Sequence, residues 1–577
     1  MTDAQTPRTE TLGARDLIWL AGACCLLFAV LAPTLPWLEF ASGGENLLVA
    51  TALESERSGK WLQPTLNAEP RIAKPPLPMW VAGASIRSQT ARDLSHSDLA
   101  VRARARRELA WQARWPFLLG ACLLAAAAFE LGRVLTERRT VAWIAFAVCA
   151  TNLMVLRAAR AATTDIALAL FVALALVGFA HAIFRGRWIS GSLGAGVAMG
   201  LGMMSKGPVV FLQSALPVAV FLGWRAWGRH RRGDAATPGA PRRAGVAIVL
   251  CTLAALSVGL PWYVAVLLDH PEAWSRWRVE ILREGATGLK PGHWYNYLSF
   301  IPLMTPWIVF FLLGFGITVL AAVRAGVRKE LSGPVLAVLC VIVPIVVMSF
   351  FRDRKERYLL PMATAGSVVA AVGLAHVRTD PRKTRRDDAV ETVHWALISG
   401  LVVGLPVAGG LLLKTVDGQP WFTLGQWLSG AAVGIILAAA AILATGRRRL
   451  PMAWATAALM LYAQTWFLWG YRNTREGRSE MKPMADLIWS RYPQARVITS
   501  GEKRLAPLDL AIYLNREVVW TADPASVAAD ERPVVLVIRQ DEDDPAPPVP
   551  PTGWEAIGKF ARDDSWWHAF VRPPKSL

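Results

Sequence analysis

The sequence predicts a mainly α-helical protein that crosses a membrane about 13 times and carries a small α/β domain at its C-terminal end. Three observations support this fold class. The 577 residues are 54% hydrophobic and 18% charged, with a mean hydropathy of +0.34. Most apolar residues form long runs with few charges, whereas the residues after 470 contain only short apolar runs. This composition excludes a soluble enzyme, a disordered chain and a disulfide-rich scaffold.

The long apolar runs are predicted to be membrane-spanning helices, because about 18 or more apolar residues are enough to cross a bilayer. The run 190–224 is too long for one span: it would extend about 52 Å as a helix, against roughly 30 Å of hydrocarbon. Gly207-Pro208 in its middle breaks a helix, so we expect two spans joined at Lys206. The other predicted spans are 17–36, 113–132, 140–156, 165–184, 244–268, 299–323, 333–350, 359–377, 395–413, 426–445 and 451–470.

The cysteines give no sign of metal or redox chemistry. All six lie inside apolar runs, and the sequence contains no Cys-x-x-Cys pair. We therefore expect buried free thiols within helices.

The distribution of basic residues predicts the orientation. An odd number of spans places the two termini on opposite sides. Lys and Arg are more frequent in the loops on the N-terminal side, so the positive-inside rule places the N-terminus in the cytoplasm. This distribution accounts for much of the net charge of +19 without nucleic acid as a partner. The predicted organisation is a cytoplasmic tail (1–16), a transmembrane region (17–470) with an exterior loop (38–112), and an exterior domain (471–577).

The exterior C-terminal domain is predicted to be α/β. Val497-Ile498, Val518-Val519 and Val534–Ile538 are short β-type runs, and Leu505–Tyr513 between them has a helical pattern. The sequence shows no phosphate-binding Gly-rich loop here.

Two acids at the exterior edge of the membrane are candidates for chemistry. Glu45 follows Ser42 at capping-box spacing and precedes an apolar-periodic run, so a structural cap is an equally good interpretation. Asp165 opens the fourth span, where an acid often serves only as a cap or a dipole partner. The sequence leaves both alternatives open.

Cations and aromatic residues gather on the same exterior side. Proline residues make the loop around Lys74 stiff, and a dense charged cluster surrounds Lys355. Snorkelling side chains and plain solvated charge are the structural alternatives. The candidates are Lys74, Lys206, Lys355, Arg357 and Tyr358, with Arg283, His293 and Tyr295 in the loop 269–298. Many cations and few acids at a bilayer edge suit a lipid-linked phosphate, because cations stabilise a phosphate leaving group.

The order and spacing of these residues resemble a known family. Glu45, Glu54, Gly59-x-Trp61 and Lys74-Pro-Pro-Leu resemble, without a gap, the first exterior loop of the bacterial lipid A aminoarabinose transferases. That family belongs with the protein mannosyltransferases among the GT-C glycosyltransferases. Further matches are Arg160 with Asp165, Met204–Pro208, Arg283 with His293 and Tyr295, Pro306-Trp307, and Lys355 with Tyr358 and Pro361. The resemblance covers about residues 17–375 and implies a GT-C transmembrane fold.

The resemblance implies a transfer reaction in the bacterial inner membrane. The donor would be a sugar, an aminoarabinose-like pentose or a hexose, on a polyprenyl phosphate such as undecaprenyl phosphate. The acceptor would be lipid A, another glycan or a protein outside the cytoplasm. Lys74, Arg283, Lys355, Tyr358 and Lys206 would bind the phosphate. Glu45 and Asp165 would serve the acceptor or the developing positive charge, with Glu54, His293, Tyr295 and Arg357 as further site candidates.

The chain departs from the family at one position. The family has an Asp-Glu pair where this chain has Gly44-Glu45, so the first acid is missing. Glu45 or Asp165 would then take over its role, or the acceptor would be a phosphate, which is already ionised and needs little deprotonation.

Other readings remain open from the sequence. One is a transporter or flippase of sugar-lipids, although no internal repeat supports it. Another is a catalytically altered homologue that only binds sugar-lipids. No cofactor is firmly implied; a divalent metal is left open, with Glu45, Glu54, Asp165 and His293 as conceivable ligands. The basic stretch Arg102–Arg107 would contact anionic membrane lipids.

Overall fold

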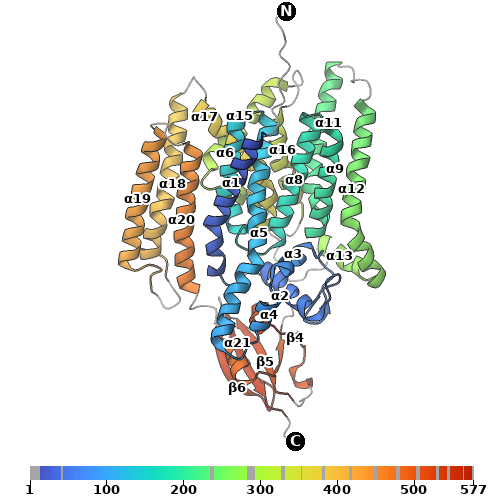
Figure 1. Cartoon of the computed structure of the whole chain (residues 1–577), viewed down its shortest axis with the longest axis vertical. Coiled ribbons are helices and arrows are strands. Elements are labelled where there is room, and N and C mark those ends of the chain that lie inside the picture. The colour runs from blue at the N-terminus through green and yellow to red at the C-terminus, as the bar shows by residue number, and fades with distance from the viewer. Residues whose placement is uncertain are drawn as a thin grey trace, which may run out of the picture.

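The computed structural model describes residues 13–574, apart from 41–42, 234–239, 283–292, 327–331, 352–353, 380–383, 415–418, 447–450, 476–480, 502–506, 528–531, 542–545 and 563–564. A bundle of long helices makes up most of the molecule, and a small sheet domain lies beyond one end of it (Figure 1). The predicted fold class, a mainly α-helical membrane protein with a small C-terminal sheet domain, is confirmed. The protein is a multi-pass membrane protein.

The bundle helices follow the predicted apolar runs. Their bounds are α1 Ala14–Leu31 continued by η1 Ala32–Trp37, α5 Leu99–Thr136, α6 Arg139–Thr151, α7 Leu153–Ala158, α8 Thr164–Phe184, α9 Trp188–Lys206, α10 Val209–Gln213, α11 Ala215–Arg232, α12 Ala240–Asp269, α15 Ile308–Ala325, α16 Gly333–Met348, α17 Ala363–Thr379, α18 Arg385–Leu411, α19 Leu424–Gly446 and α20 Met452–Arg475. Among the described residues, nine helices are long and apolar enough to cross a membrane, and two shorter apolar helices, α6 and α16, accompany them. The count of 13 spans stays a prediction.

The break predicted in the run 190–224 is present. Helix α9 ends at Lys206, and Gly207 follows with φ +87°, a conformation that favours glycine. Pro208 then precedes α10. The break leaves Lys206 at a helix end, on the side of the bundle nearest the sheet domain.

Small residues let the helices approach closely. A Cβ atom added at Gly314 in α15 would lie 1.9 Å from the carbonyl oxygen of Val369 in α17. One added at Gly373 in α17 would lie 2.1 Å from the carbonyl oxygen of Phe310. Such close backbone contact is the usual way in which membrane helices gain packing energy.

The segment 38–112, predicted to be an exterior loop, consists largely of helices and a short hairpin. It contains α2 Gly43–Ser58, the hairpin of β1 Thr65–Leu66 and β2 Glu69–Pro70, α3 Leu77–Ser85 and α4 Ser88–Asp93. Helix α2 is buried from Glu45 to Ser55, apart from the half-buried Leu47, and it packs on α3 and on the C-terminal domain.

Helix α5 begins well before the span predicted at 113–132. Its 38 residues would measure about 57 Å, so its first part stands outside a hydrocarbon layer of roughly 30 Å. Asp98 caps the helix by accepting a hydrogen bond from the Ala100 amide at 2.8 Å. The polar stretch after Asp98 is therefore the outer part of a long helix (Figure 1).

The C-terminal domain is a mixed five-stranded sheet with two helices. Its elements are α21 Met481–Arg491, β3 Arg496–Ser500, α22 Leu508–Leu514, β4 Val518–Trp520, η6 Pro524–Ser526, β5 Val534–Asp541, β6 Glu555–Arg562 and β7 Ser565–Arg572. The strand order is β4-β3-β5-β7-β6; β3 is parallel to β4 and β5, and β7 is antiparallel to β5 and β6. The three predicted strands are present, and β6 and β7 extend the sheet beyond them.

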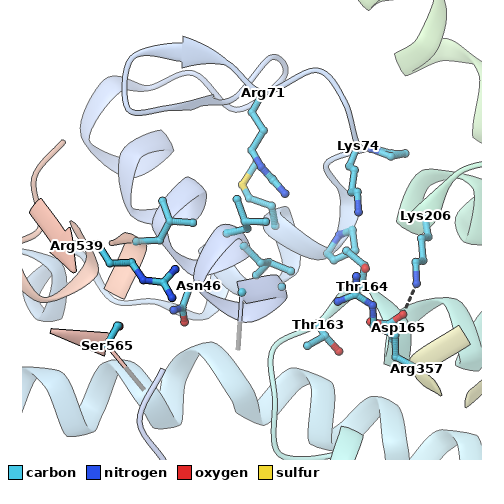
Figure 2. A pocket seen from close by; sticks show the side chains of 18 of the residues that line it. Asn46, Arg71, Lys74, Thr163, Thr164, Asp165, Lys206, Arg357, Arg539 and Ser565 are labelled. Carbon is cyan, nitrogen blue, oxygen red and sulfur yellow. Dashed lines mark hydrogen bonds and ion pairs between the residues drawn. The ribbon is translucent and has the colours of Figure 1, made fainter. Parts of the chain in front are cut away.

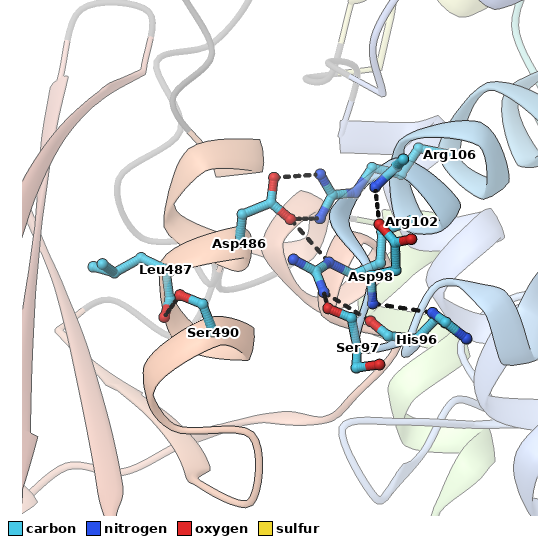
Figure 3. Close-up of polar contacts among 9 residues, drawn as sticks. His96, Ser97, Asp98, Arg102, Arg106, Asp486, Leu487 and Ser490 are labelled. Carbon is cyan, nitrogen blue, oxygen red and sulfur yellow. Dashed lines mark hydrogen bonds and ion pairs between the residues drawn. The ribbon is translucent and has the colours of Figure 1, made fainter.

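Charged residues attach this domain to the outer part of α5 (Figure 3). Asp486 in α21 accepts hydrogen bonds from Arg102 Nε at 3.0 Å and from Arg106 Nη2 at 2.8 Å. Both arginine side chains are buried. The expectation that the stretch 102–107 meets lipid head groups is therefore wrong for these two arginines, which are paired with Asp486.

The second part of this interface is a buried tyrosine. Tyr513 in α22 lies under the Arg106 guanidinium, whose Cζ is 5.5 Å from the ring centroid. Burial raises the pKa of Tyr513 well above its usual value, so the phenol stays neutral beside the cation. The domain and the bundle thus share one interface next to the cavity described below.

Candidate functional site

A cavity of about 530 Å³ lies where the segment 38–112, the helix bundle and the C-terminal domain meet. Figure 2 shows cationic side chains on several of its walls. Its lining residues are Gly43, Gly44, Asn46, Leu47, Leu48, Arg71, Lys74, Pro75, Pro78, Met79, Thr163, Thr164, Asp165, Lys206, Arg357, Leu508, Arg539, Ser565 and Trp567. Four of them were predicted from the sequence as site residues: Lys74, Asp165, Lys206 and Arg357.

An ion pair forms one wall of the cavity. Asp165 is the second residue of α8 and Lys206 is the last residue of α9, and the Lys206 ammonium contacts the Asp165 carboxylate (Figure 2). The Lys206 Nζ also lies 4.5 Å from the centroid of the Tyr358 ring. Three predicted site residues from three separate segments are therefore in direct contact.

The loop that carries Lys74 is held in place by tryptophans. Trp80 Nε1 donates to the Trp61 carbonyl oxygen at 2.7 Å, and Trp262 Nε1 donates to the Leu62 carbonyl oxygen at 2.9 Å. Trp277 in α13 (Ala273–Leu282) donates to the carbonyl oxygen of the buried Ile72 at 2.7 Å. These bonds fix both sides of the loop, so Lys74 points into the cavity from a rigid support.

The segment 354–362 forms another wall. It contains η4 Glu356–Met362, and Arg357 lines the cavity next to Asp165 (Figure 2). Lys355 directly precedes η4 and is close enough to repel the Lys206 ammonium, although it does not line the cavity.

Two further candidates lie outside the cavity. His293 and Tyr295 stack on each other with ring centroids 4.8 Å apart, and Tyr295 is 48% exposed. Asn296 Nδ2 donates to the Arg354 carbonyl oxygen at 3.2 Å, which joins this loop to the segment of Lys355. Arg283 lies outside the described residues.

Glu45 does not line the cavity. Its carboxylate forms a bidentate pair with Arg114 in α5, at 2.7 Å to Nε and 2.9 Å to Nη2, and it also accepts the Ala162 amide at 2.8 Å. Arg114 in turn donates to the carbonyl oxygens of Leu35 and Leu38. Glu45 thus connects the start of α2 to the segment before Asp165. This arrangement fits a positioning role better than contact with substrate.

Glu54 also has a structural partner. Its carboxylate accepts the amides of Asn67 at 2.7 Å and Ala68 at 3.0 Å. Both residues have positive φ, so Glu54 stabilises the turn between β1 and β2. Glu54 does not line the cavity.

Two arginines of the cavity were not among the site residues predicted from the sequence. Arg71 lies in the same loop as Lys74, and Arg539 projects from β5 of the C-terminal domain (Figure 2). Arg539 pairs with Asp541 at 2.6 Å. Arg71 could have been found from its place in the stiff loop, whereas no local signal in β5 marks Arg539 as a cavity residue.

The electrostatic character of the cavity is strongly positive. Five lining residues are cations, and Asp165 is the one acid among the described lining residues. In the part of the chain that the structure describes, no group of three His, Cys, Asp or Glu residues is close enough to share a metal ion. The four conceivable metal ligands do not converge, because Glu45 pairs with Arg114, Glu54 with the turn, Asp165 with Lys206 and His293 with Tyr295.

Parts of the sequence are similar to known proteins. Residues 107–276 match the family described as dolichyl-phosphate-mannose-protein mannosyltransferase. Over 297 residues the chain is 25% identical to the undecaprenyl phosphate-alpha-4-amino-4-deoxy-L-arabinose arabinosyl transferase of Erwinia tasmaniensis, covering 50% of each chain. The enzyme of that name from Pseudomonas aeruginosa is 30% identical over 200 residues, which are 33% of this chain and 32% of the relative. The chain therefore spans about half or less of the curated relatives that it matches.

Solved structures match over almost the whole length. The crystal structure of ArnT from Cupriavidus metallidurans in the apo state has a TM-score of 0.71 at 19% identity, covering 96% of this chain and 97% of that one. The same protein bound to undecaprenyl phosphate has a TM-score of 0.69 at 20% identity, with the same coverage. The chain therefore has the fold of ArnT over almost its whole length, and residues 107–276 are similar in sequence to the mannosyltransferase family.

Proposed function

We propose that the chain transfers a sugar from a polyprenyl phosphate, such as undecaprenyl phosphate, to an acceptor outside the cytoplasm. The observation that carries this proposal is the cation-lined cavity at the end of the bundle, with Asp165 as its acid. Similarity to the arabinosyl transferases and to ArnT, which has been solved with undecaprenyl phosphate, supports the proposal.

On the donor side, Lys74 and Lys206 approach the cavity from different walls (Figure 2). A phosphate between them would accept charge-assisted hydrogen bonds, which are stronger than neutral ones. The Tyr358 ring forms a cation–π contact with the Lys206 ammonium. The charge of Lys355 adds to the positive potential around Lys206. Arg283 is proposed as a further phosphate ligand on the resemblance alone.

The proposed reaction is a displacement at the anomeric carbon. An acceptor oxygen forms a bond to this carbon while the bond to the lipid phosphate oxygen breaks, and the lipid phosphate leaves with the electron pair. Cations stabilise the charge that grows on the leaving phosphate. Asp165 is placed to stabilise the positive charge that develops on the sugar or to accept a proton from a hydroxyl acceptor.

We also propose the bacterial inner membrane as the location, with the N-terminus in the cytoplasm and the C-terminal domain in the periplasm. Lipid A, another glycan or a protein is the proposed acceptor. The sugar is proposed to be an aminoarabinose-like pentose or a hexose.

Sugar transfer in detergent separates this proposal from a flippase, because a detergent micelle has no second compartment. The protein is incubated with undecaprenyl phosphates that carry a sugar and with bacterial membrane extract as the source of acceptors. The rate at which the sugar is transferred to an acceptor is measured. The wild type is expected to transfer sugar, and Asp165→Asn to be slower by about 10²–10⁴-fold. Glu555→Gln, an exposed acid in β6, is the control and keeps the wild-type rate.

Translocation of sugar-lipid in vesicles without any transfer in detergent would contradict the proposal in favour of a flippase. Equal rates for the wild type and Asp165→Asn would remove Asp165 from the mechanism. Gly44 favours a second candidate, a homologue that binds sugar-lipids without catalysis. In that case Gly44→Asp would create a transfer activity that the parent lacks.

A further inference from the structure

A second cavity lies at the end of the bundle that points away from the C-terminal domain (Figure 1). Helix α5 begins beside α21 and ends at this cavity, which has a volume of about 580 Å³. The last turns of α5 and α8, the second halves of α11 and α17 and the starts of α6 and α16 form its walls. Helices α5, α8 and α11 are long and apolar enough to cross a membrane, so the second cavity lies among the ends of membrane helices.

The inner wall of the second cavity is apolar and comes from four helices. The side chains that carry this character include Val134, Val141, Phe184 and Val372. One side of the cavity is closed by backbone contact, because a Cβ added at Gly333 would lie 2.0 Å from the Leu135 carbonyl oxygen. This wall can bury hydrocarbon, which is favourable, whereas a hydrated ion gains nothing from it.

Two arginines line the same cavity. Arg138 lies at the turn between α5 and α6 and is exposed, and Arg225 in α11 is half-buried. The Arg225 Cζ lies 5.8 Å from the centroid of the Phe221 ring, and this ring lies 5.8 Å from that of Phe184 in the cavity wall. Arg225 is therefore held against the apolar wall, and its guanidinium group lies next to a surface that suits hydrocarbon.

The acid of the second cavity does not cancel this positive charge. Glu137 is the one acid among the described lining residues, and its carboxylate pairs with Arg185 Nη1 at 3.3 Å. Arg185 does not line the cavity, so its charge offsets Glu137 from outside. The described lining residues and this partner thus amount to three arginines and one glutamate. A ligand that matches them is an anion with an apolar part.

We propose that the second cavity binds an anionic phospholipid of the surrounding membrane. Arg138 and Arg225 contact the phosphodiester of the head group, and the first methylene groups of the acyl chains lie on the apolar wall. Arginine suits this role because its planar guanidinium group binds phosphate oxygens through two hydrogen bonds. Basic pockets between membrane helices are known sites for anionic lipid head groups. None of the residues of this cavity lines the cavity of Asp165, so the site is separate from the proposed sugar transfer.

Native mass spectrometry of the full-length protein in detergent tests this site. The protein is titrated with phosphatidylglycerol, with the zwitterionic phosphatidylethanolamine and with undecaprenyl phosphate, and inorganic phosphate is added as a competitor. The wild type is expected to bind phosphatidylglycerol at least about tenfold more tightly than phosphatidylethanolamine. A chain with both Arg138→Gln and Arg225→Gln is expected to bind phosphatidylglycerol at least about tenfold more weakly than the wild type, because it loses both contacts to the phosphate.

The matched control removes the same charge elsewhere. A chain with both Arg187→Gln and Arg324→Gln loses two exposed arginines at the same end of the bundle, neither of which lines the cavity. It is expected to keep phosphatidylglycerol binding within about threefold of the wild type. Val372→Phe fills part of the apolar wall without a change of charge, and it is expected to weaken phosphatidylglycerol binding at least about threefold. If Val372→Phe does not fold, the arginine variants decide alone.

Three results would overturn the site. The first is equal weakening in the lining and control chains, which would mean that phosphatidylglycerol follows the overall charge of this end. The second is displacement of phosphatidylglycerol by equimolar inorganic phosphate, which would indicate a site for small anions. The third is a loss of undecaprenyl phosphate binding, with phosphatidylglycerol binding unchanged, in the chain that lacks Arg138 and Arg225.

Discussion

Glu45 and Asp165 are both acids at the outer end of the helix bundle, yet their surroundings differ. Asp165 lines the cavity and pairs with Lys206, whereas Glu45 is 3% exposed and pairs with Arg114. The sequence could predict both positions, since each stands at a helix start. It could not separate their roles, because the deciding partners, Arg114 and Lys206, come from other helices.

A double-mutant cycle tests the buried pair at this residue scale. Glu45→Gln and Arg114→Met are each expected to destabilise the protein by about 3–5 kcal/mol, because each leaves a buried charged or polar partner unpaired. The double variant is expected to lose less than the sum of the two, since no charge is left behind. Thermal unfolding in detergent gives the comparison, with Glu555→Gln as the control. Additive losses would contradict direct coupling between the two side chains.

At the scale of elements, apolar runs predict helices well, but they say nothing about where polar helices continue. Helix α5 begins at Leu99 because Asp98 caps it, and its polar outer part is stabilised by contact with α21. The strands β3, β4 and β5 were predictable from runs of Val and Ile. Strands β6 and β7 were missed because charged and polar residues, together with Gly558, interrupt their apolar pattern.

The contact between α5 and α21 gives a prediction for the C-terminal domain. Asp486 serves two buried arginines, so Asp486→Asn is expected to weaken the attachment of α21 strongly. Hydrogen exchange of the α21 amides should rise at least about tenfold, as expected for an element that opens locally. Glu555→Gln should leave this exchange unchanged. Equal protection of α21 in the wild type and Asp486→Asn would show that apolar contacts alone hold the domain.

At the scale of the whole molecule, the cavity is assembled from segments that are distant in sequence. The loop of Lys74, the ends of α8 and α9, the segment of Arg357 and the strand of Arg539 meet only in the folded chain. The resemblance to the aminoarabinose transferases could suggest the first four. Arg539 could not be predicted, because its place depends on how the C-terminal domain packs on the bundle.

The proposed orientation is tested by chemical labelling. Single cysteines are introduced as Glu555→Cys in the C-terminal domain and Arg138→Cys at the turn between α5 and α6, two exposed positions at opposite ends of the molecule. In intact spheroplasts a membrane-impermeant maleimide is expected to label Glu555→Cys. Arg138→Cys should react only after permeabilisation. The reverse pattern would contradict an N-terminus in the cytoplasm.

The most direct test of sugar transfer compares the lipid and glycan mass spectra of cells with the gene, cells without it, and cells complemented with Asp165→Asn. We expect one extracytoplasmic lipid or glycan to lose a pentose, aminopentose or hexose mass on deletion. The wild-type gene should restore that mass, and Asp165→Asn should not. Identical spectra in all three strains, with the protein present in the membrane, would contradict the proposed transferase.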